Sequence, residues 1–177
     1  MQSHTVEIIE LVEVDYRTLS ATINVVEDGT YGIITFDNVL GIYYRWVGSF
    51  CPAPQILGTP FLRTWSTSES YDGTLNYAFF LKALDPEIKY IYAGRDEIAD
   101  FHDEGELKKV TLEDIKSSGL KGIFEIKDDY VFITGVAHNK DKDISFFDVG
   151  SWNILAFDRN GEPVAYQREG TYLAEYF

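Results

Sequence analysis

The sequence is poor in cysteine and has no long apolar run. Cys51 is the single cysteine in 177 residues, which excludes an intramolecular disulfide and a cysteine-rich zinc site. No apolar run approaches the roughly 20 residues of a membrane-spanning helix, so no membrane partner is expected. The N-terminus lacks a basic stretch followed by an apolar one. This pattern predicts no signal peptide and a location in the cytoplasm, or in a host cytoplasm.

Basic residues are also scarce. The chain has 15 Lys and Arg against 29 Asp and Glu, a formal net charge of -14. Nucleic-acid-binding proteins neutralise phosphates with Lys and Arg, so direct binding of nucleic acid is not expected. Opposite potentials speed encounter and fix register, which favours a basic protein partner. The alternative is that the negative charge serves solubility alone.

Local catalytic motifs are missing as well. The sequence contains no Gly-x-x-x-x-Gly-Lys-Ser/Thr, no Gly-x-Gly-x-x-Gly and no Gly-x-Ser-x-Gly. Cys51 would need a neighbouring histidine to act as a nucleophile, and a small buried hydrophobic side chain is the preferred interpretation. We therefore predict no catalytic residues and no cofactor. The question of enzyme activity stays open, with a preference for a non-enzyme.

Two stretches resemble metal sites and fail on their required residues. His102-Asp103-Glu104 has the His-x-Glu spacing of zinc deaminases, but that chemistry also needs a cysteine pair downstream. Residues 139–145 alternate oxygen-bearing side chains as a calcium loop does, yet Ile144 and Gly150 stand where glycine and a bidentate acid are required. No metal site is predicted.

The chain is nevertheless rich in what a folded core needs. It is 45% hydrophobic and contains 12 Tyr, 12 Phe and 3 Trp. Large rings suit the pleated surface of a sheet. At this length one domain is the default, so we predict a single globular domain over residues 1–177.

The N-terminal part predicts a meander of about four strands. Residues 18–26 alternate apolar and polar side chains, which is typical of a half-buried strand. Residues 5–15 alternate less cleanly, and their β-branched content favours a strand over a helix. Turns are expected at Asp28-Gly29 and Asp37-Asn38.

The middle of the chain mixes elements. Three prolines within residues 51–60 predict a loop, and a strand is expected over 61–68. Residues 75–84 are ambiguous. Thr111 and Asp114 have the spacing of a capping box, with Gly119 placed to end a helix over 112–118. A second short helix over 96–103 is an open alternative.

The last third predicts hairpins around Asp128-Asp129 and around Arg159-Asn160-Gly161. Turn patterns recur about every ten residues along much of the chain. The predicted fold is therefore mainly β (α+β with minor helix): an antiparallel sandwich or barrel of about ten short strands. One or two short helices are expected near residues 95–120.

One acidic run is a candidate binding patch. It consists of Asp96, Glu97, Asp100, Asp103, Glu104 and Glu106, with no Lys or Arg among them. If residues 96–103 are helical, Asp96, Asp100 and Asp103 share one face, where like charges repel. A basic docking partner would relieve that repulsion. The alternatives are a solvated edge, or a loose metal site that includes His102.

An aromatic run around one cation is the second candidate. On a strand, Tyr44 and Trp46 share one face while Tyr43 and Arg45 share the other. We expect the first pair to face the core. Tyr43 and Arg45 would then be partner-binding residues, because Tyr and Arg are enriched in binding hot spots. The alternative is a surface ion pair of Arg45 beside a cross-strand aromatic pair.

Two functions fit these observations. The first is a non-catalytic, acidic protein-binding module of the inhibitor or immunity type, which docks on a basic partner such as a nucleic-acid enzyme. The second is a β-barrel that holds a small molecule, as a carrier or simple enzyme, in an aromatic-lined cavity. The oligomeric state is not indicated by the sequence.

Overall fold

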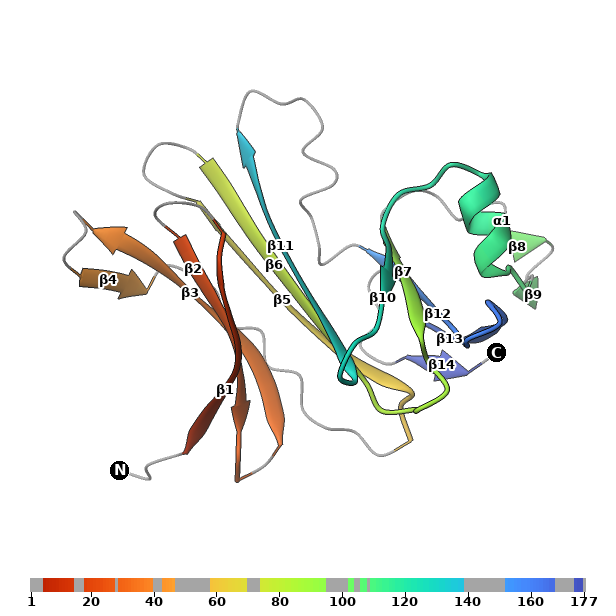
Figure 1. The fold of residues 1–177 in the computed structure, drawn as a ribbon, viewed down its shortest axis with the longest axis horizontal. Coiled ribbons are helices and arrows are strands. Elements are labelled where there is room, and N and C mark those ends of the chain that lie inside the picture. Colours follow the sequence, from red (N-terminus) through yellow and green to blue (C-terminus); the bar gives the residue numbers. More distant parts are fainter. Residues whose placement is uncertain are drawn as a thin grey trace. The chain divides into compact units, whose positions relative to one another are not determined.

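The computed structural model confirms a β-rich, antiparallel fold (Figure 1). It describes residues 5–14, 18–27, 29–39, 43–46, 58–69, 74–94, 102–103, 106–107, 109–138, 152–167 and 174–176. These residues form fourteen strands and one helix. The count exceeds the ten strands predicted because four of the strands are only two or three residues long.

The chain divides into two compact units that alternate along the sequence. Unit 1 comprises residues 1–57, 63–81 and 132–149, and unit 2 comprises residues 58–62, 82–131 and 150–177. Each unit is described separately below. The single domain expected over residues 1–177 stays a prediction.

Unit 1 is built on two antiparallel sheets. The first has the order β1-β2-β3-β4, formed by β1 (Val6–Glu13), β2 (Thr18–Val25), β3 (Thr30–Val39) and β4 (Tyr43–Trp46). The second has the order β11-β6-β5, formed by β11 (Tyr130–His138), β6 (Thr74–Ala83) and β5 (Phe61–Glu69). The ambiguous segment 75–84 is thus a strand, with Ala78 and its apolar neighbours buried.

The β2–β3 hairpin sets the register of the first sheet. Its pairs run without a break from Val25↔Thr30 to Thr18↔Asp37. The turn expected at Asp37-Asn38 is wrong, because β3 continues to Val39 and Asp37 pairs with Arg45 of β4. Backbone pairing on both sides of β3 outweighs the local turn preference of the two residues.

The polar side of β2 is the buried side. Asn24 is paired with Tyr31, whose ring stacks on Phe80 of β6 with centroids 5.6 Å apart. Paired residues share a face, so this face is directed toward the second sheet. Its other members include Thr18, Ser20 and Thr22, each at most 1% exposed.

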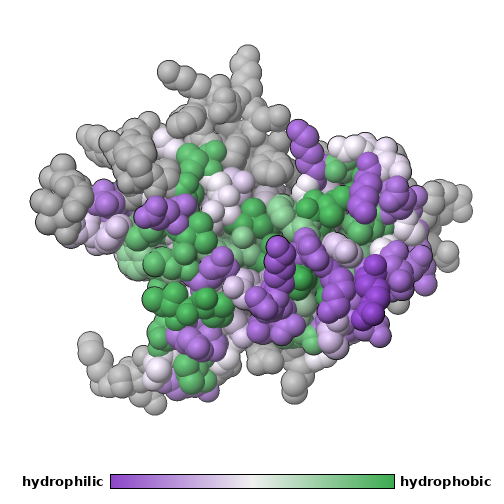
Figure 2. Space-filling model, viewed as in Figure 1, coloured by the Kyte–Doolittle hydropathy of each residue, from purple (hydrophilic) through white to green (hydrophobic). Residues whose placement is uncertain are grey.

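One pair of buried hydroxyl groups is hydrogen-bonded inside this unit, whereas Thr22 Oγ1, Ser66 Oγ and Ser68 Oγ have no hydrogen-bond partner among the described residues. Ser20 Oγ and Thr35 Oγ1 lie 3.0 Å apart in a buried contact. Such a bond matters because a buried hydroxyl without a partner costs about 1–3 kcal/mol. In Figure 2, hydrophobic side chains, in green, reach the surface in the region of the N-terminal sheet, interspersed with hydrophilic ones, in purple.

A glycine on β11 makes room for an aromatic ring of β6. A Cβ placed at Gly135 would overlap the ring of Tyr77. The ring therefore covers a bare stretch of backbone, as aromatic residues do beside glycines on edge strands. Burial by this arrangement raises the pKa of the Tyr77 hydroxyl.

Unit 2 is built on a five-stranded antiparallel sheet with the order β10-β7-β12-β13-β14. Its strands are β7 (Tyr90–Gly94), β10 (Ile123–Glu125), β12 (Asn153–Phe157), β13 (Pro163–Gln167) and β14 (Glu175–Tyr176). Two more short strands, β8 (His102–Asp103) and β9 (Glu106–Leu107), pair with each other.

The helix α1 (Leu112–Ser117) begins at the predicted capping box. The Asp114 backbone N–H donates to Thr111 Oγ1 at 3.2 Å, and the Thr111 N–H donates to Asp114 Oδ2 at 2.9 Å. Gly119, with φ of 75°, follows the C-cap Ser118. Glycine tolerates this left-handed conformation without steric cost.

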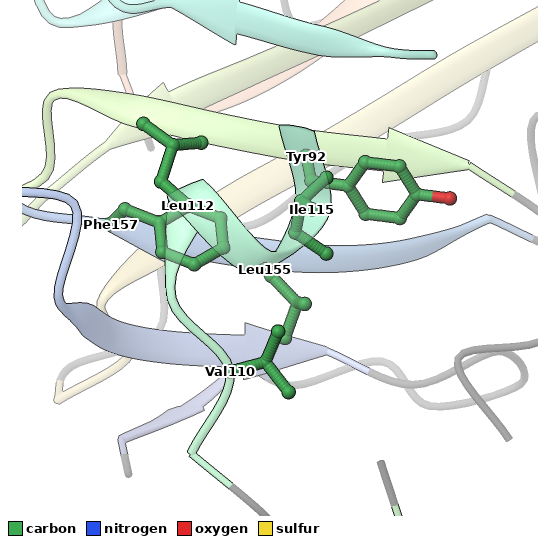
Figure 3. Packing of buried hydrophobic residues seen from close by; sticks show 6 residues of the cluster. All are labelled: Tyr92, Val110, Leu112, Ile115, Leu155 and Phe157. Atoms are coloured by element: carbon green, nitrogen blue, oxygen red, sulfur yellow. The ribbon is translucent and has the colours of Figure 1, made fainter. Parts of the chain in front are cut away.

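The helix covers the sheet with its apolar face (Figure 3). Leu112 and Ile115 are buried, and they pack with Tyr92 of β7 and with Phe157 of β12. Val110 and Leu155 complete this cluster of buried side chains. Truncating a side chain as buried as Ile115 to alanine typically costs about 2–5 kcal/mol.

Both predicted turns of the last third are present. Asp128 and Asp129 have φ of 50° and 68° and lie between the bridged residues Lys127 and Tyr130. Two consecutive positive φ values are the mark of a type I′ turn. The turn between β12 and β13 ends at Gly161, whose φ is 84°. Its first residue, Asp158, accepts hydrogen bonds from the backbone N–H of Asn160 and Glu162 at 2.7 and 2.9 Å.

Two expectations are limited by what the structure describes. Asp103 lies in β8, so a helix that runs through residue 103 is wrong, and residues 96–101 are outside the described part. Cys51 and the calcium-like segment 139–150 also lie outside it. Within the described residues, no helix has the length and apolar character needed to cross a membrane.

We predict that Gly135→Ala destabilises the protein by about 1–3 kcal/mol, because the added methyl group meets the Tyr77 ring. Tyr77→Ala in the same chain should relieve part of this cost, whereas Tyr77→Phe should not, since it keeps the ring. Urea unfolding of the single and double variants measures the coupling. Additive effects of Gly135→Ala and Tyr77→Ala would contradict the contact.

We predict a pH-dependent role for Asp158. The backbone N–H of Glu162, followed by groups of Asn160, holds the pKa of this carboxyl below its ordinary value. Because its pKa is lower in the folded state, the ionised Asp158 carboxylate stabilises the fold at pH values above its unfolded pKa of about 3.9. This stabilisation is lost as the pH falls through the pKa of the folded state. Asp158→Asn should therefore lower Tm at pH 7, and the difference from wild type should shrink below about pH 4. Thermal melts over this range measure it; a constant difference would contradict the mechanism.

Candidate protein-binding surface

The outer face of the N-terminal sheet is apolar. We define it by the residues that the pairing register places opposite to the Thr18–Ser20–Thr22 side. On β2 and β3 they are Leu19, Ala21, Ile23, Val25, Ile34 and Phe36. On the flanking strands they are Val6, Ile8, Leu11, Tyr44 and Trp46, together with the acid Glu13. One cross-strand row joins Leu11, Ala21 and Ile34 on β1, β2 and β3. The row that reaches both edges consists of Glu13, Leu19, Phe36 and Trp46.

The flanks of this outer face are exposed to solvent. Ile8 and Trp46 are each 62% exposed, and Leu11 is 55% exposed. Between them Ala21 and Ile23 are buried, while the other members on β2 and β3 are partly buried. Figure 2 shows the resulting concentration of hydrophobic side chains. Apolar side chains that gather on one exposed face commonly mark an interaction site.

The expectation for the aromatic run of β4 is partly wrong. Tyr44 and Trp46 do share a face, opposite Asn38 and Phe36, but that face is exposed rather than part of the core. Tyr43 is 57% exposed, and its part in binding stays a prediction. β4 is an edge strand at the solvent-facing end of its sheet, so both of its faces are accessible.

Arg45 forms the surface ion pair that the sequence left as an alternative. Its Nη2 lies 3.8 Å from Asp37 Oδ2, across the β3–β4 pair. The Arg45 side chain is 62% exposed, whereas the Asp37 side chain is only 12% exposed. The pair leaves the planar guanidinium accessible at the edge of the sheet.

The charge of this sheet is strongly one-sided. Its described residues include the acids Glu7, Glu10, Glu13, Glu27 and Asp37, and the single base Arg45. Because Asp37 is opposed by Arg45, the remaining negative charge lies on β1 and the adjoining turn. Glu27 there accepts a hydrogen bond from the Thr5 backbone N–H at 2.7 Å. Glu13 lies on the outer face and Glu7 and Glu10 lie on the hydroxyl side of β1. The edge strand β1 thus carries acids on both faces, and this edge is the acidic border of the sheet.

The acidic run falls mostly outside the described residues. Asp96, Glu97, Asp100 and Glu104 are not described, and Asp103 is placed only by its backbone, opposite Glu106. Asp96, Asp100 and Asp103 were expected to share one face of a helix. Asp103 lies in the strand β8 instead, so it is not part of such a face. Binding by this run stays a prediction.

A pocket in unit 2 is the feature closest to a small-molecule site. It has a volume of about 320 Å³ and lies between α1 and the β12–β13 turn. Its lining carries Glu113, Lys116, Arg159 and Glu162, and Tyr90 is its one aromatic residue. This lining differs from the aromatic cavity that the barrel alternative expects. No cluster of three or more potential metal ligands occurs among the described residues.

Sequence reasoning missed Ile8, Leu11 and Trp46 as surface residues. One signal was present: in 5–15, acidic and apolar residues are mixed on both faces of the strand, with no clean alternation. Strands that bury one face against a core usually alternate. The mixed pattern is therefore an indication of an edge strand that is open to solvent on both faces.

Comparison with models of protein families, with curated proteins and with solved structures gives no match. The function of the chain therefore has to be inferred from the chemistry of its surfaces. Among these, the outer face of the N-terminal sheet combines exposed aromatic and aliphatic side chains with an acidic border.

Proposed function

We propose that this chain is a non-catalytic protein-binding module that docks on a basic partner protein. The observation that carries the proposal is the exposed apolar outer face, with Ile8 and Trp46 each 62% exposed in a chain of net charge -14. Burying such side chains would contribute about 25 cal/mol per Å² of apolar surface. The acidic border would select a partner of opposite charge.

The composition of the surface is that of an interface. Interfaces are enriched in Trp, Tyr and Arg, which form their energetic hot spots. Tyr43, Tyr44, Arg45 and Trp46 provide these residue types on one exposed strand. Aromatic side chains lose little conformational entropy on binding. They therefore serve as anchors, while the glutamates of β1 guide approach through long-range attraction.

A basic nucleic-acid enzyme is the kind of partner that we propose. Such enzymes carry Lys and Arg along the surface that contacts phosphates. An acidic module seated on that surface would compete with the nucleic acid and act as an inhibitor. Electrostatic steering of this kind weakens as salt rises, because the Debye length falls to about 3 Å at 1 M.

We predict that a partner captured by the immobilised chain at low salt is released at high salt. The double variant Ile8→Ser/Trp46→Ser should reduce capture at least about tenfold, equivalent to about 1.4 kcal/mol, while both sites are too exposed for a large stability cost. Tyr176→Ser is the matched control, since Tyr176 is 52% exposed in unit 2. Capture would be measured on lysate of the source organism, with the captured protein identified. Capture of the partner that changes neither with salt nor in the double variant would contradict the proposal.

The acidic run gives a separate prediction. Charge reversal of Asp96, Asp100 and Asp103 to Lys should lower capture of the same partner, because it replaces three attractive charges by repulsive ones. The measurement is the same capture assay, with folding of the variant checked by thermal melting. Unchanged capture would show that the run has no part in docking and would leave the outer face as the binding surface.

A further inference from the structure

The strand β1 has an open edge. Among the described residues it pairs with β2 and with no other strand. An edge strand presents unpaired N–H and C=O groups that can pair with another extended chain. β1 is eight residues long, and none of its residues is buried.

Other edges are less suited to pairing. The edge strands β4, β10 and β14 have four, three and two residues. β5 is longer, but Phe61, Leu62, Thr64 and Ser66 are buried along it. In β11 the described side chains are all partly buried. β1 thus combines length with exposure.

The side chains of β1 specify what could pair with it. Val6, Ile8 and Leu11 lie on the apolar outer face, whereas Glu7 and Glu10, paired with Asn24 and Thr22, lie on the other face. A strand paired with β1 would place the side chains of one of its faces beside Val6, Ile8 and Leu11. The side chains of its other face would lie beside Glu7 and Glu10. Basic residues at those alternate positions would face opposite charges.

A second copy of the same chain is a poor occupant of this edge. Antiparallel pairing of two β1 strands would gather the glutamates Glu7, Glu10 and Glu13 of both copies along one seam. Like charges on neighbouring strands destabilise pairing. The register shift between Ile8 and Glu10 interrupts the edge for any added strand, so the charge of β1 is what argues against a second copy.

We propose that β1 is a strand-addition site for an extended segment of the basic partner, in which Lys or Arg alternates with apolar residues. The inference rests on the proposed function and adds the manner of docking. Main-chain hydrogen bonds along β1 supply affinity, and the alternating side chains supply specificity. The apolar half of the added strand extends the outer face by one strand.

The test uses a capped eight-residue peptide of alternating Lys and Val, matched in length to β1. The control peptide has the same side chains, with methyl groups on its backbone nitrogens, so that it keeps its charge but cannot donate hydrogen bonds to a strand. Fluorescence anisotropy at physiological salt measures binding. Amide hydrogen exchange of β1, compared with that of β12, reports whether the edge becomes protected.

We expect the unmodified peptide to bind and to protect β1 amides, while the methylated peptide shows no measurable binding. The variant Glu7→Lys/Glu10→Lys should weaken binding about tenfold. Glu87→Lys/Glu125→Lys makes the same change in charge at exposed sites in unit 2 and should change binding less than about twofold.

The outcomes separate this inference from the proposed function. Equal binding of both peptides, without protection of β1, would overturn strand addition and leave docking on a basic partner intact. If neither peptide binds and capture of the partner does not change with salt, both the strand-addition site and the proposed function are overturned. A dimer in sedimentation, with β1 amides protected before any peptide is added, would assign the edge to a second copy and overturn the inference.

Discussion

The pairing of β2 with β3 is the constraint on which the surfaces of unit 1 depend. Side chains alternate along a strand, so a shift of one residue would exchange the two faces of the sheet. The observed register places the hydroxyl side of β2 with Tyr31, and Tyr31 stacks on Phe80. That single orientation buries the threonines and serines and turns Leu19, Ile34 and Phe36 outward. The accessible apolar face follows from it.

The sequence predicted the strands of this sheet but not their orientation. Alternation in residues 18–25 identifies a two-faced strand, and its apolar side would ordinarily be expected inward. The inward side is instead the polar one, where Ser20 and Thr35 are hydrogen-bonded at 3.0 Å while Thr22 Oγ1 has no partner among the described residues. No local pattern shows that Tyr31, on this polar side, stacks on Phe80 of the second sheet. For the same reason Trp46 was expected in the core and is found in solvent.

Unit 2 followed its local signals more closely. The capping box at Thr111 and Asp114 and the turns at Asp128 and Asn160 are short-range features, in which a few neighbouring residues satisfy each other's hydrogen bonds. Such features survive in almost any tertiary context. The candidate surface, by contrast, requires four strands in register. Its β4 members are Tyr44 and Trp46, whereas Tyr43 and Arg45, for which binding was predicted, lie on the opposite side of the strand.

The interleaving of the two units along the chain has a consequence for synthesis. Residues 58–62 and 82–131 of unit 2 interrupt unit 1, whose last strand, β11, ends at His138. The N-terminal sheet can therefore emerge from a ribosome long before the sheet that covers its hydroxyl face is complete. During that interval both faces of the nascent sheet are exposed, and long-range pairing of this kind is slow. Exposed apolar surface and unpaired strand edges of this kind favour aggregation, so the interval before β11 emerges is when this topology is most exposed to it.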